Sequence, residues 1–197
     1  MKNIRTLCLT TLLAAATIVS CQKLEEMNNN PNQITLGETA PSSLLQNLLY
    51  DGNWTLQYRS WRINGDLMQY AMQSDGLEKI SCFVLKASDS EMLWRNLSGS
   101  CMNAVHMAQL AVAQDDPNSQ AIAITLKAFY VSAMTDIFGD MPYSEAFRIV
   151  GDNITHPKYD EQKDIYASLC DELKTADGLY DTSVTYDGAS YDLLYNG

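Results

Sequence analysis

The stretch that decides the fold of this chain is residues 135–146, which read TDIFGDMPYSEA. It ends an almost wholly apolar segment, residues 121–138, whose apolar side chains recur at the spacing of an α-helix. Gly139 is able to adopt the left-handed conformation that caps a helix, and Pro142 prevents the helix from resuming. These residues predict a buried core helix with a glycine cap. Its inward face is expected to carry Ile122, Leu126, Phe129, Ala133 and Ile137, and its opposite face is also apolar, with Ile124, Val131 and Met134.

Three further helical patterns precede this segment. The first begins at Pro41, runs through four leucines and pauses at Gly52. The second covers residues 54–73 and contains Gly65. The third is long: residues 88–91 (SDSE) form a capping-box pattern at its start, and residues 115–117 (DDP) end it. Its inward face is expected to carry Leu93, Leu97, Cys101, Ala104, Ala108 and Ala111, with Trp94 and Val105 beside them.

A last helix is expected after the loop of residues 139–159, with Asp160 as its N-cap. Its inward residues would be Ile165, Leu169, Leu173, Ala176 and Tyr180, and its outward residues Asp164, Asp171, Glu172 and Lys174. The long third helix and the apolar one are separated by only a few residues, so they are expected to pack as an antiparallel pair. The patterns together predict an all-α fold built from helix pairs, although no internal repeat is visible.

The exact residues of the opening stretch add a resemblance to this prediction. Residues 127–130 (KAFY), followed by TDIFGDMPYSEA, closely resemble the central N-terminal motif of the SusD/RagB family of outer-membrane nutrient-binding lipoproteins. Residues 157–166 (PKYDEQKDIY) resemble the helix that follows in that family, and residues 31–32 lie in a similar "NPN" element. The resemblance implies tetratricopeptide-like helix pairs of a SusD-like fold. Because members of the family are much longer, it also implies that residues 41–197 are the N-terminal part of a helical domain whose C-terminal part is missing.

The N-terminal segment has the layout of a secretory signal peptide over residues 1–20. Lys2 and Arg5 precede a short apolar stretch, residues 7–19, that is too short for a good transmembrane helix. Cys21 follows directly and is interpreted as the lipid-carrying cysteine of a lipoprotein, the alternative being an ordinary signal peptide with a coincidental cysteine. Residues 21–40 are polar and are expected to form a lipid-anchored tether and a loop leading into the first helix. Residues 22–26 resemble the acidic stretch that directs such lipoproteins to the outer face of the outer membrane.

Charge and cysteine content exclude some classes of protein. The net charge of −11, with few and scattered Lys and Arg residues, argues against nucleic-acid binding. After lipidation of Cys21 three thiols would remain beyond it, Cys82, Cys101 and Cys170, and three cannot all pair with one another. A disulfide framework is therefore not indicated. These cysteines lie in apolar sequence contexts, in which buried free thiols are common.

No catalytic, cofactor-binding or metal-ligating motif is recognisable in the sequence. His106 and His156 have no Cys or carboxylate pair at metal-ligand spacing, and His106 is expected to be structural. Asp136 and Asp140 are a conceivable carboxylate pair for glycoside cleavage, but their place at a helix end favours hydrogen bonds that fix the loop. The chain is therefore not expected to be an enzyme or to bind a cofactor or metal.

A concentration of aromatic and amide residues around positions 54–73 suggests a binding surface. Sugar-binding proteins place aromatic faces against the ring and amide side chains against the hydroxyls. Core packing is the preferred interpretation for Trp54 and Tyr58, which leaves Trp61, Gln69 and Tyr70 as the candidate ligand-binding residues. Asn64 and Gln73 belong to the same stretch.

The family resemblance implies a function without catalysis. It describes a cell-surface lipoprotein that binds a nutrient, in the first instance an oligosaccharide, and passes it to a SusC-type TonB-dependent transporter in the outer membrane. One alternative is an exported helical-repeat scaffold that binds only protein partners. A secreted hydrolase is a third possibility, disfavoured because no catalytic constellation is visible in the sequence.

Overall fold

The computed structural model describes residues 39–72, 80–147, 154–184 and 186–192. The predicted signal peptide, the candidate lipidation site Cys21 and the tether up to residue 38 lie outside the described residues, as does Gln73. The elements in chain order are η1 (Pro41–Leu44), α2 (Leu45–Asn47), η2 (Leu48–Gly52), α3 (Asn53–Leu67), η3 (Ile80–Cys82), α4 (Ala87–Ala113), α5 (Pro117–Phe138), β1 (Met141–Pro142), β2 (Tyr159–Asp160), α7 (Gln162–Leu179) and η4 (Asp187–Tyr191).

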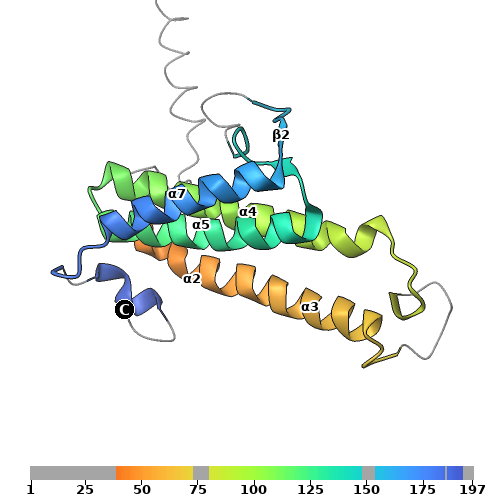
Figure 1. Ribbon diagram of the computed structural model, residues 1–197. Coiled ribbons are helices and arrows are strands. Elements are labelled where there is room, and N and C mark those ends of the chain that lie inside the picture. Colours follow the sequence, from red (N-terminus) through yellow and green to blue (C-terminus); the bar gives the residue numbers. More distant parts are fainter. Residues whose placement is uncertain (1–38, 73–79, 148–153, 185, 193–197) are drawn as a thin grey trace, which may run out of the picture. The chain divides into compact units, whose positions relative to one another are not determined.

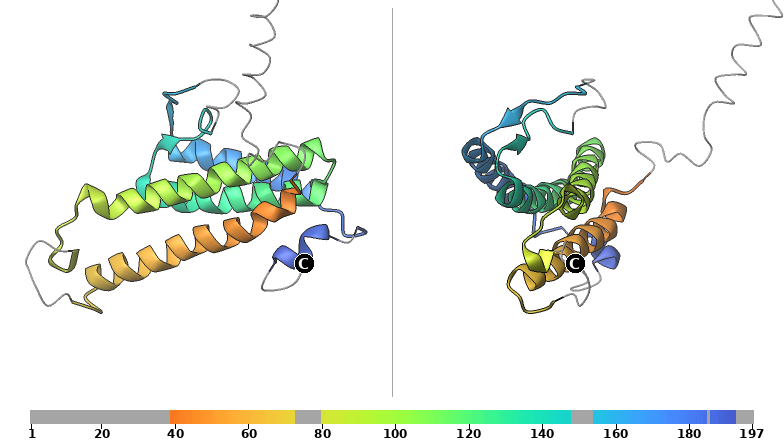
Figure 2. Two further views of the ribbon diagram at one scale, coloured as in Figure 1. Left: turned by 180° about the vertical axis from the view of Figure 1, so that it is seen from behind. Right: turned by 90° about the vertical axis from the view of Figure 1, so that its right-hand side faces the viewer.

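The core is formed where α5 packs between α4 and α7 (Figure 1). The turn between α4 and α5 is short, so the two helices run antiparallel, and α7 lies along the other side of α5 (Figure 2). The described elements are helical apart from one two-stranded antiparallel pair, in which Met141 lies opposite Asp160. The all-α fold built from helix pairs is therefore confirmed.

Helix α5 ends at Phe138 as the sequence predicted, but it starts at Pro117, a few residues before the predicted apolar segment. At its start the Asp116 carboxylate accepts a hydrogen bond of 3.0 Å from the Ser119 main-chain N–H, and Pro117 occupies the first helical turn. At its end Gly139 has a φ of +74°, the positive value that glycine adopts without strain. Its ψ of −132° differs from that of a left-handed helix. Gly139 therefore ends the helix with a positive φ, but not in the left-handed helical conformation that the sequence predicted.

The inward face predicted for α5 is wrong in part. Phe129 and Ile137 are each 49% exposed, whereas the residues of the nominally opposite face, Val131 and Met134, are fully buried. Because the helix is apolar on all sides, the periodicity of its sequence cannot decide which side meets α4 and α7. Within the described residues α5 is also the one helix long and apolar enough to cross a membrane. Its packing between two other helices identifies it here as a core helix.

The long helix α4 has the predicted core face but a different cap. Leu93, Leu97, Cys101, Ala104 and Ala111 are all buried. The capping carboxylate is that of Asp89, which accepts a hydrogen bond of 2.8 Å from the Lys86 main-chain N–H, so the helix begins one residue before the predicted box. Of the three thiols, only Cys101 is buried, and burial raises its pKa to about 12. Cys82 and Cys170 are exposed, which corrects the expectation that they are buried.

The predicted pause at Gly52 does not occur, because the backbone continues from Pro41 to Leu67 as one helical rod with changes of pitch. The turn Leu48–Gly52 is π-helical, and Gly52 itself has helical backbone angles. Gly65 does not interrupt α3 either. The rod ends at Leu67, earlier than the predicted residue 73, and Gln69 beyond it has a φ of +58°.

The opening stretch of the sequence connects α5 to α7. Asp160, predicted as the N-cap of α7, instead lies in β2, where its carboxylate accepts hydrogen bonds from the main-chain N–H groups of Tyr143 (3.2 Å) and Ser144 (2.7 Å). The α7 N-terminus is capped from a distance, because the Gln162 main-chain N–H donates to Asp140 Oδ1 at 2.9 Å. Asp136 Oδ1 accepts a hydrogen bond of 2.7 Å from the Tyr166 hydroxyl. Asp140 thus fixes the loop, as predicted, whereas Asp136 joins the end of α5 to α7.

A charged cluster holds the same loop on its inner side. Glu172 Oε1 accepts hydrogen bonds from Tyr143 Oη at 2.6 Å and from Lys127 Nζ at 2.7 Å. Burial, together with the Glu172 carboxylate, raises the pKa of Tyr143 well above its usual range. Glu172 was expected to face solvent, but it is half-buried, whereas Leu173 and Tyr180, expected to face inward, are exposed. The remaining inward residues of α7, Ile165, Leu169 and Ala176, are buried as predicted.

Candidate functional site

Three aromatic residues of α3 form a row along one face of the helix, hereafter the aromatic row: Trp54, Tyr58 and Trp61. Their spacing of four and three residues brings them onto one face. The rings of Trp54 and Tyr58 are stacked, with centroids 4.8 Å apart and planes inclined by 9°, and Tyr58 and Trp61 lie 6.4 Å apart. Trp54 is 45% exposed and Trp61 is 71% exposed, so the expectation that Trp54 packs in the core is wrong. Tyr58 is half-buried.

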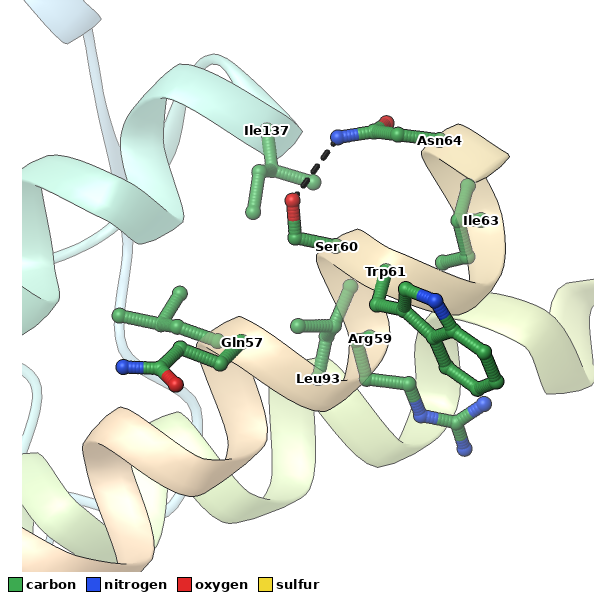
Figure 3. A pocket seen from close by; sticks show the side chains of 9 residues that line it. Gln57, Arg59, Ser60, Trp61, Ile63, Asn64, Leu93 and Ile137 are labelled. Carbon is green, nitrogen blue, oxygen red and sulfur yellow. Dashed lines mark hydrogen bonds between the residues drawn. The ribbon is translucent and has the colours of Figure 1, made fainter. Parts of the chain in front are cut away.

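A hollow of about 750 Å³ lies between α3, the N-terminal part of α4 and the end of α5 (Figure 3). It is hereafter the larger hollow. Its lining is mostly apolar and includes Leu56, Ile63, Leu93 and Ile137, with Gln57, Arg59, Ser60, Trp61 and Asn64 as the remaining residues. The Asn64 side chain donates a hydrogen bond of 2.9 Å to the Ser60 hydroxyl within it. A mostly apolar wall with a few polar groups is the usual composition of a small-molecule site.

A second hollow, the smaller hollow, of about 330 Å³ adjoins the end of the aromatic row. Its lining consists of Tyr58, Trp61, Arg62, Asp66, Ala71 and Met72. Arg62 is held over the Tyr58 ring, with its guanidinium carbon 5.7 Å from the ring centroid, and one of its nitrogens donates to the Tyr58 hydroxyl at 3.1 Å. Trp61 lines both hollows, so it forms the boundary between them.

Of the three candidate residues from the sequence, only one lies at the hollows. Trp61 lines both hollows, whereas Gln69 and Tyr70 lie beyond the end of α3, line neither hollow and are exposed, Tyr70 to 88%. Sequence reasoning missed Arg59 and Arg62. Their spacing of three residues around Trp61 was the available signal, because residues at that spacing share a helix face.

The chemical groups at this surface are described by the linings of the two hollows. Within the described part of the chain, no group of three or more His, Cys, Asp or Glu residues is arranged to hold a metal ion. Asp66 is the carboxylate that lines the smaller hollow, and the larger hollow has none in its lining. The hollows instead offer aromatic faces, amide and hydroxyl groups, and two guanidinium groups.

The described residues form an all-α body of paired helices with an exposed aromatic row beside a mostly apolar hollow. Residues 31–197 match the SusD-like family described as "starch-binding associating with outer membrane". The chain therefore belongs to the SusD-like family, as its TDIFGDMPYSEA stretch indicated.

A comparison with solved structures agrees with the family match. The chain is similar to a chitin-binding protein of known structure, with 30% sequence identity and a TM-score of 0.61. The similarity covers 80% of this chain and 34% of the other, so this chain spans about a third of the length of that relative. A comparison with curated proteins found no match.

Proposed function

We propose that this chain is the nutrient-binding part of a cell-surface lipoprotein that captures an oligosaccharide and passes it to a SusC-type TonB-dependent transporter. The observation that carries the proposal is the exposed aromatic row of α3, which borders two hollows in a member of the SusD-like family. Solvent-exposed stacked rings stabilise the fold less than buried ones do. They suit a ligand whose C–H groups pack on a ring and whose hydroxyls meet neighbouring amides.

The relatives support a glycan as the ligand. The family is described as starch-binding, and the solved relative is a chitin-binding protein. Both ligands are polysaccharides whose sugar rings have apolar faces rimmed by hydrogen-bonding groups. Trp54, Tyr58 and Trp61 would provide the stacking surface, and Asn64 and Gln57 the nearby amides. Gln69 and Tyr70 would extend the surface beyond the end of α3.

Membrane attachment and transfer complete the proposal. Cys21 would carry the lipid that anchors the protein to the outer membrane, facing the cell exterior, and the polar residues after it would serve as a tether. The transporter would receive the ligand directly from the anchored protein. The association of the family with the outer membrane supports this location.

Ligand binding is tested with the full-length protein and with chitin and starch oligosaccharides as probes. Titration calorimetry should detect binding of at least one of them, and Trp61→Ala should weaken it about tenfold, the effect of losing a central aromatic contact. Tyr159→Ala is the matched control, because Tyr159 is an equally exposed aromatic residue of β2 outside both hollows. Loss of binding in both variants, or in neither, would count against the α3 surface.

Transfer is tested by purifying the full-length protein from detergent-solubilised outer membranes. A TonB-dependent barrel should be recovered with it, and Cys21→Ser should abolish its recovery from the membrane fraction. Recovery of the protein alone, with no glycan bound, would exclude the delivery function. Recovery with other proteins and no glycan binding would favour an exported scaffold instead.

A further inference from the structure

The two arginines that border the aromatic row form no ion pair with a carboxylate among the described residues. Among the described residues, Arg95, Lys127, Lys158 and Lys174 each form an ion pair with a carboxylate, at 2.7 to 3.8 Å. Arg59 and Arg62 form none with the residues the structure describes, although the chain has a net charge of −11. Acidic residues are therefore abundant in this protein, yet none of those in the described ranges forms an ion pair with these two guanidinium groups.

The positions of the two arginines on α3 are energetically unfavourable in the free protein. Arg59 and Arg62 are three residues apart, so they lie near one another on the helix, where two like charges destabilise it. The Nε of Arg59 is buried and has no hydrogen-bond partner among the described residues. A buried donor without an acceptor costs free energy. Arg62 is held over Tyr58 by its ring contact and its hydrogen bond, so its guanidinium is already oriented.

Each arginine faces one of the two hollows that share Trp61. Arg59 is the one charged residue in the lining of the larger hollow, and Arg62 lines the smaller one together with Asp66. A ligand that stacks on Trp61 would therefore meet a positive charge on either side of the ring. A carboxylate matches the planar fork of a guanidinium, since both form two parallel hydrogen bonds.

We propose that the α3 surface binds an acidic oligosaccharide, one that contains uronic acid residues, with Arg59 and Arg62 recognising the sugar carboxylates and Trp61 stacking against a sugar ring. This inference rests on the proposed glycan-binding function and specifies the class of glycan. The ligand carboxylate supplies the ion-pair partner that Arg59 and Arg62 lack among the described residues. Asp66 also lines the smaller hollow, so a ligand carboxylate there is favoured on the side of Arg62 and disfavoured beside Asp66.

The test uses the full-length protein with a short oligogalacturonate and its methyl ester as probes. The two ligands have the same sugar rings and differ at the carboxyl group, where the ester has no negative charge and carries a methyl group. The acid should bind about tenfold more tightly than the ester at low ionic strength, as expected for one charge-assisted contact. Added salt should reduce this difference, because screening weakens an exposed charge pair.

Variants separate charge recognition from stacking. Arg59→Gln and Arg62→Gln should each reduce the preference for the acid, and the double variant should abolish it. Lys174→Gln is the control, since it removes one positive charge from an exposed position on α7 and should keep the full preference. Trp61→Ala should weaken both ligands in equal proportion. Circular dichroism confirms that each variant is folded.

The outcomes also distinguish this inference from the function on which it rests. Equal binding of acid and ester, or binding of chitin or starch oligosaccharides with no binding of oligogalacturonate, overturns the acidic specificity and leaves the glycan-binding function intact. Absence of binding to every glycan tested overturns both. An acid preference that survives in the double arginine variant overturns the assignment to Arg59 and Arg62.

Discussion

The hydroxyl of Tyr130 donates a hydrogen bond of 2.6 Å to the main-chain carbonyl of Leu48, which ties the core helix α5 to the π-helical turn η2. Tyr130 is fully buried, and its ring occupies the space in which a side chain at Gly52 would begin. A Cβ at Gly52 would lie 2.3 Å from the Tyr130 Cζ. Gly52 has a φ of −65°, so glycine is needed here for the close approach and not for its backbone angles.

Substitution of this glycine tests the contact. Gly52→Ala should lower the free energy of unfolding by about 1–3 kcal/mol, the usual cost of inserting an atom into a packed core. Gly65→Ala is the control, because nothing lies within 4 Å of its added Cβ and the position is inside α3. That variant should be more stable than the natural chain by about 0.5–1 kcal/mol. Urea denaturation measures both. Equal effects of the two substitutions would contradict the packing described.

Removal of the Tyr130 hydroxyl has a consequence that depends on pH. The pKa of Tyr130 is raised from its usual 10.0 to about 12, mainly by burial and to a smaller extent by Cys101 and Asp51. Because the folded-state pKa is the higher one, the stabilising contribution of the neutral hydroxyl is complete below pH 10. It is lost as the pH rises through about 12. The expected loss is roughly 2–3 kcal/mol at that end of the range.

Tyr130→Phe should therefore behave differently at neutral and alkaline pH. At pH 7 it leaves the Leu48 carbonyl without its partner, which should cost about 1–3 kcal/mol. Between pH 10 and pH 12 the variant should lose less stability than the natural chain, so the two curves converge. Denaturation curves at several pH values measure this. Parallel curves over the alkaline range would show that Tyr130 does not titrate as inferred.

The ion pair beneath the loop should contribute to stability, and a surface pair on the same helix should not. Lys127 and Glu172 have side chains that are 19% and 32% exposed, whereas those of Lys174 and Asp171 are 77% and 76% exposed. Lys127→Met should lower the free energy of unfolding by about 1–3 kcal/mol, because Glu172 would keep a half-buried charge with only the Tyr143 hydroxyl as partner. Lys174→Met should have no measurable effect. A larger effect of the surface variant would refute this reading.

The carboxylate of Asp160 should make the hairpin sensitive to acid. Partial burial opposes its ionisation, but hydrogen bonds from Ser144 and Tyr143, with the charge of Lys158, hold its pKa below the usual 3.8. A lowered folded-state pKa means that the contribution is present above about pH 4 and is lost as the pH falls through the folded value. Asp160→Ala should cost about 1–3 kcal/mol at pH 7 and less at acidic pH. A difference that stays constant down to pH 2 would disprove this role.

A substitution should weaken ligand binding most where the residue lines one of the two hollows. Trp61→Ala should weaken glycan binding more than Tyr70→Ala or Gln69→Ala, because Trp61 is the one of these three residues that lines the hollows. Gln69→Ala should have the smallest effect. Quenching of tryptophan fluorescence by the ligand provides a second measurement, since Trp61 is one of three tryptophans in the chain. A larger effect at Tyr70 would move the binding surface beyond the end of α3.

The sequence predicted the helices well where local residues decide them. Asp116, Pro117 and Gly139 set the ends of α5 through caps that involve only neighbouring residues. The same holds for the buried stripe of α4, where small and apolar residues alternate with polar ones around the helix. The predicted pause at Gly52 failed because that glycine serves a contact with Tyr130, 78 positions along the chain, and no local pattern records such a contact.

The candidate site was likewise predictable only where local sequence decides it. The sequence drew attention to Trp61 through the concentration of aromatic residues in α3, but it could not show that Trp54 is exposed and stacked on Tyr58. The spacing of Arg59 and Arg62 around Trp61 was visible in the sequence, but it could not show that both lack an ion-pair partner among the described residues. Whether a charged side chain has a partner depends on which other elements come near it, and that is a property of the folded chain.

The sequence by itself determined the family, the all-α class and the ends of the core helix, because TDIFGDMPYSEA and the caps act through adjacent residues. The tertiary structure alone decided which face of α5 is buried, that Asp140 caps α7, and that Trp61 separates two hollows. The physical reason is the range of the interactions. Capping and periodicity extend over a few residues, whereas burial, ion pairing and the shape of a hollow depend on helices that are distant in sequence.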